Sequence, residues 1–229
     1  MFSSDRLLDL EQTEHSALFQ PGVPVWSALP KIDRYIEAFL TQTSDRLLGK
    51  IHQSAEIGPG VFVAPGAIVE ANAVLKGHSI IGEGTTVRSG AYVRENVIAG
   101  KNCMLGNSSE LKNSILFNNC EIPHFNYVGD SILGYKAHLG AGVVCSNVRL
   151  DRRNIRVRAN DDEAWIDTDL RKFGAIIGDR TEVGCNSVLS PGTILGRDCI
   201  IHPCTHWHGV LGENQMVENR ENFKVVPRK

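Results

Sequence analysis

Two cations and a histidine recur at multiples of six residues, and side chains of these types could bind a phosphate and move a proton. Lys112 follows Arg94 by three six-residue units, or hexads, and His124 follows Lys112 by two. If three hexads make one coil of a solenoid, Arg94 and Lys112 stack at about one strand spacing, roughly 4.8 Å. Two stacked cations beside the Tyr127 hydroxyl could form a phosphate pocket. A single histidine in a loop is more often simply solvated, so spacing alone gives His124 no role.

The scaffold that would position these side chains is visible as a six-residue repeat. An apolar residue occurs at every sixth position from 51 to 117. A helix would repeat near 3.6 residues and an amphipathic strand every two, so a period of six with Gly and Asn between predicts short strands joined by tight corners. Three units make one triangular coil, with the large apolar side chain inside. The residues in this register are Ile51, Ile57, Val63, Val69, Leu75, Ile81, Val87, Val93, Ala99, Leu105, Leu111 and Phe117, and it returns at Leu133, Leu139 and from Ile177 to Trp207. The sequence therefore predicts an all-β fold, a single-stranded parallel β-helix.

Segments that break the register divide the chain. Residues 1–48 lack it and contain Pro30 followed by helically spaced apolar residues over 31–43, which predicts an irregular arm and an amphipathic helix. The register is expected to fail at Pro123-His124 and again over 154–172, which is too polar for the interior and predicts a loop or hairpin. Insertions of this kind tend to lie on one face of a solenoid, often the binding face. We expect the β-helix over 49–210 and a capping tail over 211–229.

Bulk composition excludes several classes of function. Of 229 residues, 24 are Lys or Arg and 26 are Asp or Glu, so the net charge of −2 does not suggest nucleic acid or an anionic membrane as a partner. No apolar run approaches the roughly 20 residues needed to cross a bilayer, and the first residues do not resemble a signal peptide. The six cysteines form no CxxC pair. We expect a cytoplasmic protein with reduced thiols.

Several motifs resemble one family of hexapeptide-repeat acyltransferases. The run from His124 to Asp130 reads H-x-x-Y-x-G-D, and stretches at 106–113, 139–147, 176–179 and 212–220 are also similar. Together they resemble the C-terminal acetyltransferase domain of the bifunctional enzyme that makes UDP-N-acetylglucosamine, over about residues 75–220 and without a gap from Arg94 to Arg153. The resemblance implies a left-handed β-helix, a homotrimer with active sites at subunit boundaries, and acetyl-CoA as the acyl donor.

The resemblance also assigns roles residue by residue. His124 corresponds to the general base, Glu110 to the carboxylate that orients it, and Asn147 to an active-site asparagine near it. The remaining correspondences are the sugar-phosphate ligands Arg94, Lys112 and Tyr127, and the acyl-CoA contacts Cys185, Pro203 and Arg220. Positioning the amine against the thioester and stabilising the oxyanion with backbone donors would lower the barrier.

Departures from the family's pattern leave the acceptor open. His138 stands where the family has an asparagine that touches the sugar, and Arg153 replaces a lysine. The 154–172 insertion resembles instead a segment of related two-domain sugar-nucleotide proteins. The uridyltransferase half is missing, so a separate nucleotidyltransferase would be the partner that completes the pathway.

The expected function is therefore acetyl-CoA-dependent N-acetylation of an amino-sugar phosphate, glucosamine 1-phosphate, in UDP-N-acetylglucosamine synthesis for the cell envelope. Two alternatives are an acyltransferase acting on a nucleotide-linked amino sugar or a sugar hydroxyl, and a non-catalytic scaffold or ligand-binding subunit. No metal site is expected, because alternating polar residues at a solenoid end are usually edge groups; the residues concerned are His202, Cys204, His206 and His208.

Overall fold

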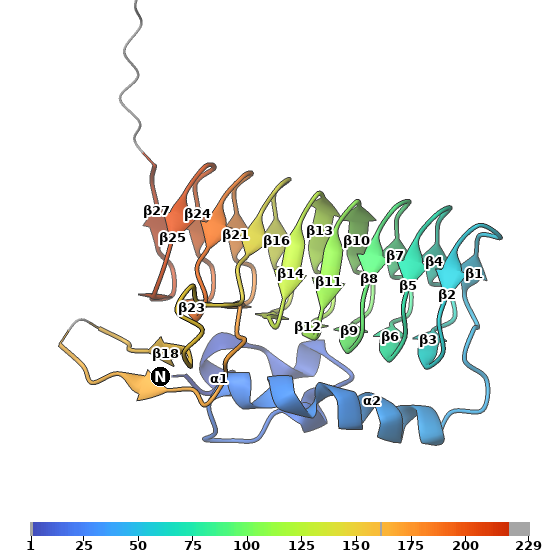
Figure 1. The fold of residues 1–229 in the computed structure, drawn as a ribbon, viewed down its shortest axis with the longest axis horizontal. Helices are drawn as coiled ribbons and strands as arrows, with labels where there is room; N and C mark the ends of the chain where they lie inside the picture. Colours follow the sequence, from blue (N-terminus) through green and yellow to red (C-terminus); the bar gives the residue numbers. More distant parts are fainter. Residues whose placement is uncertain (1, 161, 220–229) are drawn as a thin grey trace, which may run out of the picture.

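The computed structural model describes residues 2–160 and 162–219, and most of them form a parallel β-helix of triangular coils (Figure 1). Each coil contributes one short strand to each of three parallel sheets, here called sheets I, II and III. Sheet I contains β1 (Lys50–Ile51), β4 (Ile68–Val69), β7 (Thr86–Val87), β10 (Met104–Asn107), β13 (Glu121–His124), β16 (His138–Leu139), β21 (Glu182–Val183), β24 (Ile200–Ile201) and β27 (Met216–Val217).

The other two sheets follow in chain order around the prism. Sheet II contains β2 (Glu56–Ile57), β5 (Val74–Leu75), β8 (Tyr92–Val93), β11 (Glu110–Lys112), β14 (Tyr127–Gly129), β17 (Val144–Cys145), β22 (Val188–Leu189) and β25 (His206–Trp207). Sheet III contains β3 (Val61–Val63), β6 (Ser79–Ile81), β9 (Val97–Ala99), β12 (Ser114–Leu116), β15 (Ile132–Leu133), β20 (Ala175–Ile177), β23 (Thr193–Leu195) and β26 (Val210–Leu211). An edge is named by the two sheets it joins, so the II/III edge is where the chain passes from sheet II to sheet III.

Stacking of identical positions builds the core. Val69 pairs with Val87, and Leu75 with Val93, so the inward apolar residue of each hexad lies on that of the next coil. The corners use residues with positive φ, mostly Asn, Asp and Gly, as at Asn72 (φ 60°) and Asn102 (φ 53°), because Gly and short polar side chains tolerate the left-handed region best. The predicted β-helix is confirmed, while its left-handed winding stays a prediction.

The coil shortens by one residue in the middle of the solenoid. Val87 pairs with Leu105, three full hexads on, but Leu105 pairs with Ile122, which is one residue short of three hexads. Ala99 likewise pairs with Leu116 rather than Phe117, so the expectation that Phe117 points into the prism is wrong. The expected loss of the apolar position at Pro123-His124 is also wrong, because Ile122 fills it and is fully buried. One residue fewer at a corner shifts the register by one without interrupting it.

The side chain of Phe117 lies outside the prism, at the position where the preceding coil turns. Its N–H donates to the Leu133 carbonyl, as the Gly100 N–H does to the Leu116 carbonyl one coil earlier, so Phe117 stands where that coil has a glycine. The ring is fully buried and lies 5.5 Å, centroid to centroid, from Phe19 of the N-terminal arm. The side chain therefore joins the solenoid to the arm.

Sheet III is buried on both faces because the N-terminal arm covers its outside (Figure 1). The arm contains α1 (Ser4–Leu7), η1 (Leu10–Gln12), η2 (Ser16–Leu18), η3 (Val25–Lys31) and α2 (Ile32–Thr41). The predicted helix is thus present, and it buries Ile32, Ile36 and Leu40. The outer face of sheet III offers an apolar column in register, made of Phe62, Ile80, Ile98, Ile115, Ile132, Ile176 and Ile194. Phe39 of α2 contacts Phe62 with ring centroids 5.0 Å apart.

The insertion is a hairpin, as the sequence predicted. Its strands β18 (Arg156–Val157) and β19 (Ile166–Asp167) pair antiparallel, and it leaves the solenoid at the II/III edge after β17. Val144 pairs with Val188, so this coil is more than twice as long as the others, yet the register resumes unchanged. The hairpin base is anchored by Ile155 and Val157, both buried.

The solenoid continues beyond residue 210, where the sequence led us to expect the tail. β26 (Val210–Leu211) adds to sheet III and β27 (Met216–Val217) adds to sheet I. Among the residues described, no helix has the length and apolar character needed to cross a membrane.

A buried histidine in the arm makes stability sensitive to acid. Burial lowers the pKa of His15 from 6.5 to about 4, and its Nδ1 lies 3.0 Å from the Tyr35 hydroxyl. The unfolded chain takes a proton near pH 6.5 while the folded chain stays neutral, so His15 stabilises the fold above that pH and less as pH falls toward 4. We expect a loss of about 3 kcal/mol over this range from His15 alone.

Urea unfolding at several pH values from 7.5 to 4.5 measures this loss. In His15→Gln the stability should fall less steeply over the same range, because no group at this position titrates. Parallel curves for the two proteins would contradict the prediction.

Candidate functional site

Five of the residues expected to form the site come together where sheet II meets the II/III edge. Arg94 follows β8, Glu110 and Lys112 lie in β11, and Tyr127 begins β14. Leu111 pairs with Val93, so Lys112 is the next-coil neighbour of Arg94, as the spacing of three hexads predicted. Arg94 Nη1 donates to Glu110 Oε1 at 3.0 Å. This group, with Asn147, is called the edge cluster.

Asp130 organises the edge cluster from the corner. It is 4% exposed and has a positive φ of 49°. Its Oδ2 accepts from Asn147 Nδ2 at 2.6 Å and lies 4.0 Å from Lys112 Nζ, while Oδ1 accepts from Asn113 Nδ2 at 2.9 Å. A nearly buried carboxylate with three donors around it fixes their positions. Sequence reasoning gave Asp130 and Asn113 no role, although Asp130 closes the H-x-x-Y-x-G-D run.

Tyr127 provides a neutral hydroxyl in this group. Burial raises the pKa of Tyr127, and the carboxylates of Asp130 and Glu110 raise it further, against smaller opposing effects from Asn147 and Arg94. The phenol therefore stays protonated at neutral pH and can donate. With the guanidinium and ammonium groups, the cluster offers the donors that a phosphate ester needs.

Gly129 leaves the space that Tyr127 and Asn147 occupy. A Cβ at this position would lie 2.6 Å from the Tyr127 hydroxyl oxygen and 2.8 Å from Asn147 Nδ2. We expect Gly129→Ala to displace both groups and to raise the KM for a sugar phosphate about 10-fold, since one or two hydrogen bonds to a charged group are lost. Steady-state kinetics measures this, and an unchanged KM in a folded variant would contradict it.

A second glycine variant serves as the control for Gly129→Ala. Gly66 lies at a corner far from the edge cluster, and the nearest atom to a Cβ there would be the Gly84 nitrogen at 3.7 Å. Gly66→Ala is strained by its positive φ but displaces no side chain, so it should leave the KM unchanged.

His124 lies on a different edge from the edge cluster. It ends β13 on sheet I, at the I/II edge, and is half-buried. Its backbone N–H donates to Asn126 Oδ1 at 3.1 Å, and Asn126 is buried and donates to the Gly140 carbonyl at 2.7 Å. The backbone at His124 is therefore fixed by the coils on either side. Glu110, expected to orient the imidazole, accepts from Arg94 instead, and its orienting role stays a prediction.

A second aromatic side chain flanks His124 and was not singled out from the sequence. Phe125 has a positive φ of 53° and is 64% exposed, and its ring centroid lies 6.4 Å from that of His124. A large apolar residue with positive φ is uncommon, so the backbone at Phe125 is held in this conformation by the coils around it.

The expected acyl-CoA residues lie on the same I/II edge as His124. The Gly142 N–H donates to the His124 carbonyl, the Asn186 N–H to that of Ala141, and the Cys204 N–H to that of Cys185. Cys185 and Pro203 are both exposed along this row, and their roles stay predictions. Arg220 lies outside the described residues.

His138 and Arg153 are separate from both edges. His138 lies on the outer face of sheet I, in register between Glu121 and Glu182, and lines a cavity of about 410 Å³ with them. Arg153 is exposed in the segment that leads to the hairpin. Within one chain neither residue meets the edge cluster, so their expected contacts with the sugar stay predictions.

Four of the six cysteines, Cys103, Cys120, Cys145 and Cys199, are buried and pack as small core residues. Burial raises the pKa of Cys145 to about 12, so its thiol stays protonated. Cys103 Sγ donates to the Phe117 carbonyl at 3.1 Å. Cys185 and Cys204 are exposed.

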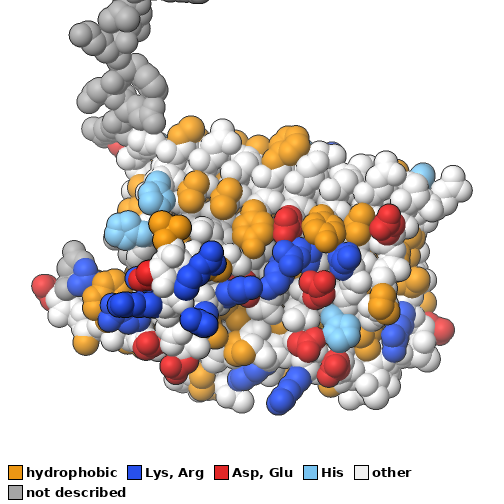
Figure 2. All heavy atoms as spheres, in the orientation of Figure 1, with side chains coloured by type: hydrophobic (Ala, Val, Ile, Leu, Met, Phe, Trp, Pro, Cys, Tyr) orange, Lys and Arg blue, Asp and Glu red, His pale blue; other side chains and the backbone are white. Residues whose placement is uncertain are grey.

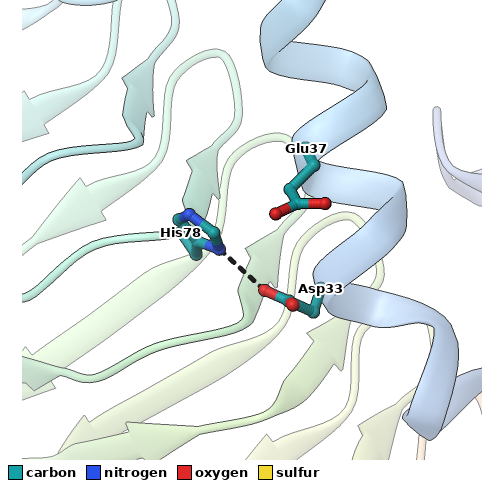
Figure 3. Close-up of side chains that lie close together, drawn as sticks. All are labelled: Asp33, Glu37 and His78. Carbon is teal, nitrogen blue, oxygen red and sulfur yellow. Dashed lines mark hydrogen bonds and ion pairs between the residues drawn. The ribbon is translucent and has the colours of Figure 1, made fainter.

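One cluster of metal-ligand side chains occurs among the described residues, and the sequence did not predict it. Asp33 and Glu37 of α2 and His78, the residue before β6, have ligand atoms within 4.8 Å of one another (Figure 3). All three are at least partly exposed, and His78 Nδ1 lies 2.7 Å from Asp33 Oδ1. This contact docks α2 on the solenoid. His202, Cys204, His206 and His208 form no such group in the described part of the chain; His206 Nε2 instead lies 2.8 Å from Ser190 Oγ.

Two protein families match parts of the chain. Residues 75–161 match the GMPPB C-terminal domain, and residues 174–206 match the bacterial transferase hexapeptide (six repeats). The first match includes the edge cluster and His124, and the second covers the coils that follow the hairpin.

Curated relatives resemble part of the chain. The bifunctional protein GlmU of Methanococcus vannielii is 36% identical over 88 residues, which are 38% of this chain and 20% of that protein. GlmU of Methanococcus maripaludis is 30% identical over 116 residues, 51% of this chain and 28% of that protein. A bifunctional sugar-1-phosphate nucleotidylyltransferase/acetyltransferase of Sulfurisphaera tokodaii is 33% identical over 90 residues, 39% of this chain and 22% of that protein. The matched segment thus spans between a fifth and somewhat over a quarter of these relatives.

Solved structures are more distant. The acetyltransferase domain of PglB from Neisseria gonorrhoeae, in complex with acetyl coenzyme A, is 12% identical, with 86% of this chain and 76% of that chain covered and a TM-score of 0.31. LpxA from Bacteroides fragilis is 13% identical, with 77% and 71% covered and a TM-score of 0.31. Residues 174–206 of this parallel β-helix match the bacterial transferase hexapeptide repeats, and 38% of the chain is 36% identical to the bifunctional GlmU protein of Methanococcus vannielii.

Proposed function

We propose that the protein is an acetyl-CoA-dependent N-acetyltransferase that acts on an amino-sugar phosphate, glucosamine 1-phosphate, in UDP-N-acetylglucosamine synthesis. The observation that carries this proposal is the convergence of Lys112, Tyr127 and Asn147 around Asp130, with Arg94 held beside them by Glu110, a donor set suited to a phosphate ester. The name of the Sulfurisphaera tokodaii relative, a bifunctional sugar-1-phosphate nucleotidylyltransferase/acetyltransferase, supports the substrate class.

The reaction needs a base, and His124 is the side chain on the I/II edge suited to that role. The imidazole takes a proton from the sugar amine as the nitrogen attacks the thioester carbonyl, and the tetrahedral intermediate collapses with loss of the CoA thiolate, which is then protonated. In the backbone at 140–142 beside His124, the Gly140 N–H donates to the Val183 carbonyl and the Gly142 N–H to the His124 carbonyl, so both are already paired within one chain. Holding amine and thioester together supplies the rest of the acceleration.

The two edges must be brought together for this chemistry. In one chain the outer face of sheet II separates His124 from Arg94 and Lys112. We propose that copies of the chain form a homotrimer in which the I/II edge of one subunit faces the II/III edge of the next, as the family resemblance implies. We also place the reaction in the cytoplasm, with a separate nucleotidyltransferase to complete the pathway.

An acceptor assay tests the proposal. CoA release from acetyl-CoA is measured with glucosamine 1-phosphate, with glucosamine and with N-acetylglucosamine 1-phosphate. We expect release with glucosamine 1-phosphate, at least 10-fold less with glucosamine because the edge cluster has no phosphate to bind, and none with the acetylated sugar. Absence of CoA release at high enzyme concentration would overturn the proposal.

A further inference from the structure

The contact between the N-terminal arm and the solenoid brings together three side chains that can each bind a metal ion. Asp33 and Glu37 lie in α2, and His78 lies at the II/III edge between β5 and β6. Figure 3 shows the three side chains directed toward one another from the helix and from the solenoid. We call this group the arm triad. It is the one group of this kind in residues 2–160 and 162–219.

The two carboxylates of the arm triad lie on one face of α2. Asp33 and Glu37 are four residues apart in this helix, a spacing that makes them neighbours, and two negative charges at this spacing repel each other. Lys and Arg side chains gather in a band across the face of the molecule drawn in Figure 2, yet no Lys or Arg of the described chain forms an ion pair with either carboxylate. A bound cation would remove the repulsion.

The solenoid holds the imidazole of His78 in place independently of the helix. His78 has a positive φ of 41°, and its carbonyl accepts from the Asn96 N–H at 2.8 Å. Gly60 leaves the space for the ring, because a Cβ there would lie 2.7 Å from His78 Cδ2 and 3.4 Å from Nε2. The ring thereby presents Nδ1 to α2, 2.7 Å from Asp33 Oδ1. A ligand atom fixed in advance lowers the cost of binding.

The docking of α2 accounts for two members of the arm triad but not for the third. The bond between His78 and Asp33 already joins the helix to the solenoid. Glu37 takes part in a hydrogen bond through its backbone carbonyl, which accepts from Thr41 Oγ1 at 2.9 Å, while its carboxylate has no partner among the described residues. That carboxylate is therefore available to a ligand held between the helix and His78.

The donor set selects the metal. One imidazole nitrogen and two carboxylate oxygens suit Zn²⁺, whereas Mg²⁺ and Ca²⁺ prefer oxygen ligands alone. With bonds of roughly 2.0–2.2 Å in a tetrahedral site, neighbouring ligand atoms lie about 3.3–3.5 Å apart. His78 Nδ1 and Asp33 Oδ1 would therefore separate slightly from 2.7 Å as the metal replaces the proton between them, and Glu37 would move closer. All three side chains are at least partly exposed, so these rotations are open to them.

We propose that the arm triad binds one Zn²⁺ per chain and that the metal clamps α2 to the solenoid. His78 Nδ1 and one oxygen each from Asp33 and Glu37 are the protein ligands, and water completes the coordination. Because His78 and Asp33 are 45 residues apart in the sequence, the site exists only when the arm is docked, so zinc stabilises the docked arm by mass action. The site is structural and does not depend on acetyl transfer.

Calorimetry with zinc chloride and the full chain, freed of metal by a chelator, tests the site without turnover. We expect one site per chain, with an affinity that falls about 10-fold or more in His78→Ala and in Glu37→Gln, because each removes one of three protein ligands. Co²⁺ bound in place of zinc should give visible ligand-field absorption that both variants lose. His52→Ala is the matched control, because His52 is an exposed histidine bonded to Ser54 and belongs to no metal-ligand group of the described chain.

Glu37→Gln separates the metal from the docking contact. It keeps the bond between His78 and Asp33, so without metal its arm should be cleaved by protease within residues 1–48 at the same rate as that of the unsubstituted protein. Zinc should slow this cleavage in the unsubstituted protein and not in Glu37→Gln. Absence of zinc binding, or equal affinity in both variants, as histidines elsewhere on the surface would give, would overturn the site. Zinc binding with no protection of the arm would overturn the clamp.

Discussion

Replacing His124 by alanine is expected to lower the turnover of acetyl-CoA with glucosamine 1-phosphate by about 10²- to 10⁴-fold, the usual contribution of a positioned general base. The side chain is half-buried at the end of β13, and its backbone is fixed by Asn126 and by the Gly142 N–H, so the substitution removes the imidazole without disturbing the coil. The effect should fall on kcat, because the edge cluster that is expected to bind the sugar phosphate lies elsewhere.

Two measurements accompany the His124→Ala kinetics. The midpoint of thermal unfolding should be close to that of the unsubstituted protein. This would show that the loss of activity does not come from a loss of folded structure. His52→Ala, at an exposed histidine bonded to Ser54 near the first coil, should keep full activity. Full activity in His124→Ala would remove the histidine from the mechanism, whatever the role of the edge cluster.

Replacing Phe117 by alanine is expected to destabilise the protein by about 3–5 kcal/mol, the usual cost of deleting a fully buried phenylalanine. The ring fills the space between the III/I edge of the solenoid and the arm, and it packs on Phe19 at 5.5 Å. Because the residue lies outside the prism, its loss should release the arm before the coils unfold. Urea unfolding gives the stability, and proteolysis within residues 1–48 reports release of the arm.

The Phe117 prediction separates an arm contact from a core contact. In Phe125→Ala the ring lost is 64% exposed, so a change within about 0.5 kcal/mol is expected. Combining Phe117→Ala with Phe19→Ala should cost less than the sum of the two, since each ring loses the same partner. Additive losses, with the arm no more accessible to protease, would contradict the packing described.

The hexad pattern predicted the solenoid well because each six-residue unit reports its own inward position. It misplaced Phe117, which is one residue beyond the inward position. In a sequence, an apolar residue at that point cannot be told apart from an apolar residue at the inward position itself. Ala99 and Leu116 are one residue closer in the chain than three hexads, and only the paired backbone shows which residue faces in. The buried outer face of sheet III is also visible in the sequence. Ile98 and Ile115 come directly before inward residues, so each of these hexads has two consecutive apolar residues.

The site was predictable in part for the same reason. Residues one coil apart, such as Arg94 and Lys112, were placed together by arithmetic on the repeat, and the structure confirms that they are neighbours. The role of Asp130 was not predictable, because it depends on a corner conformation and on side chains from neighbouring coils. The separation of His124 from Lys112 agrees with the spacing argument, since a distance of two hexads, unlike one of three, places two residues on adjacent faces of the prism.

The arm over sheet III limits how identical subunits can assemble. Because the apolar column from Phe62 to Ile194 is already covered within the chain, a partner copy cannot use that side without displacing the arm. Identical subunits are therefore expected to contact one another through the two uncovered sides, sheets I and II, and through the edge between them that carries His124. One segment outside the repeat thus acts as a steric block on one of the three sides of the prism.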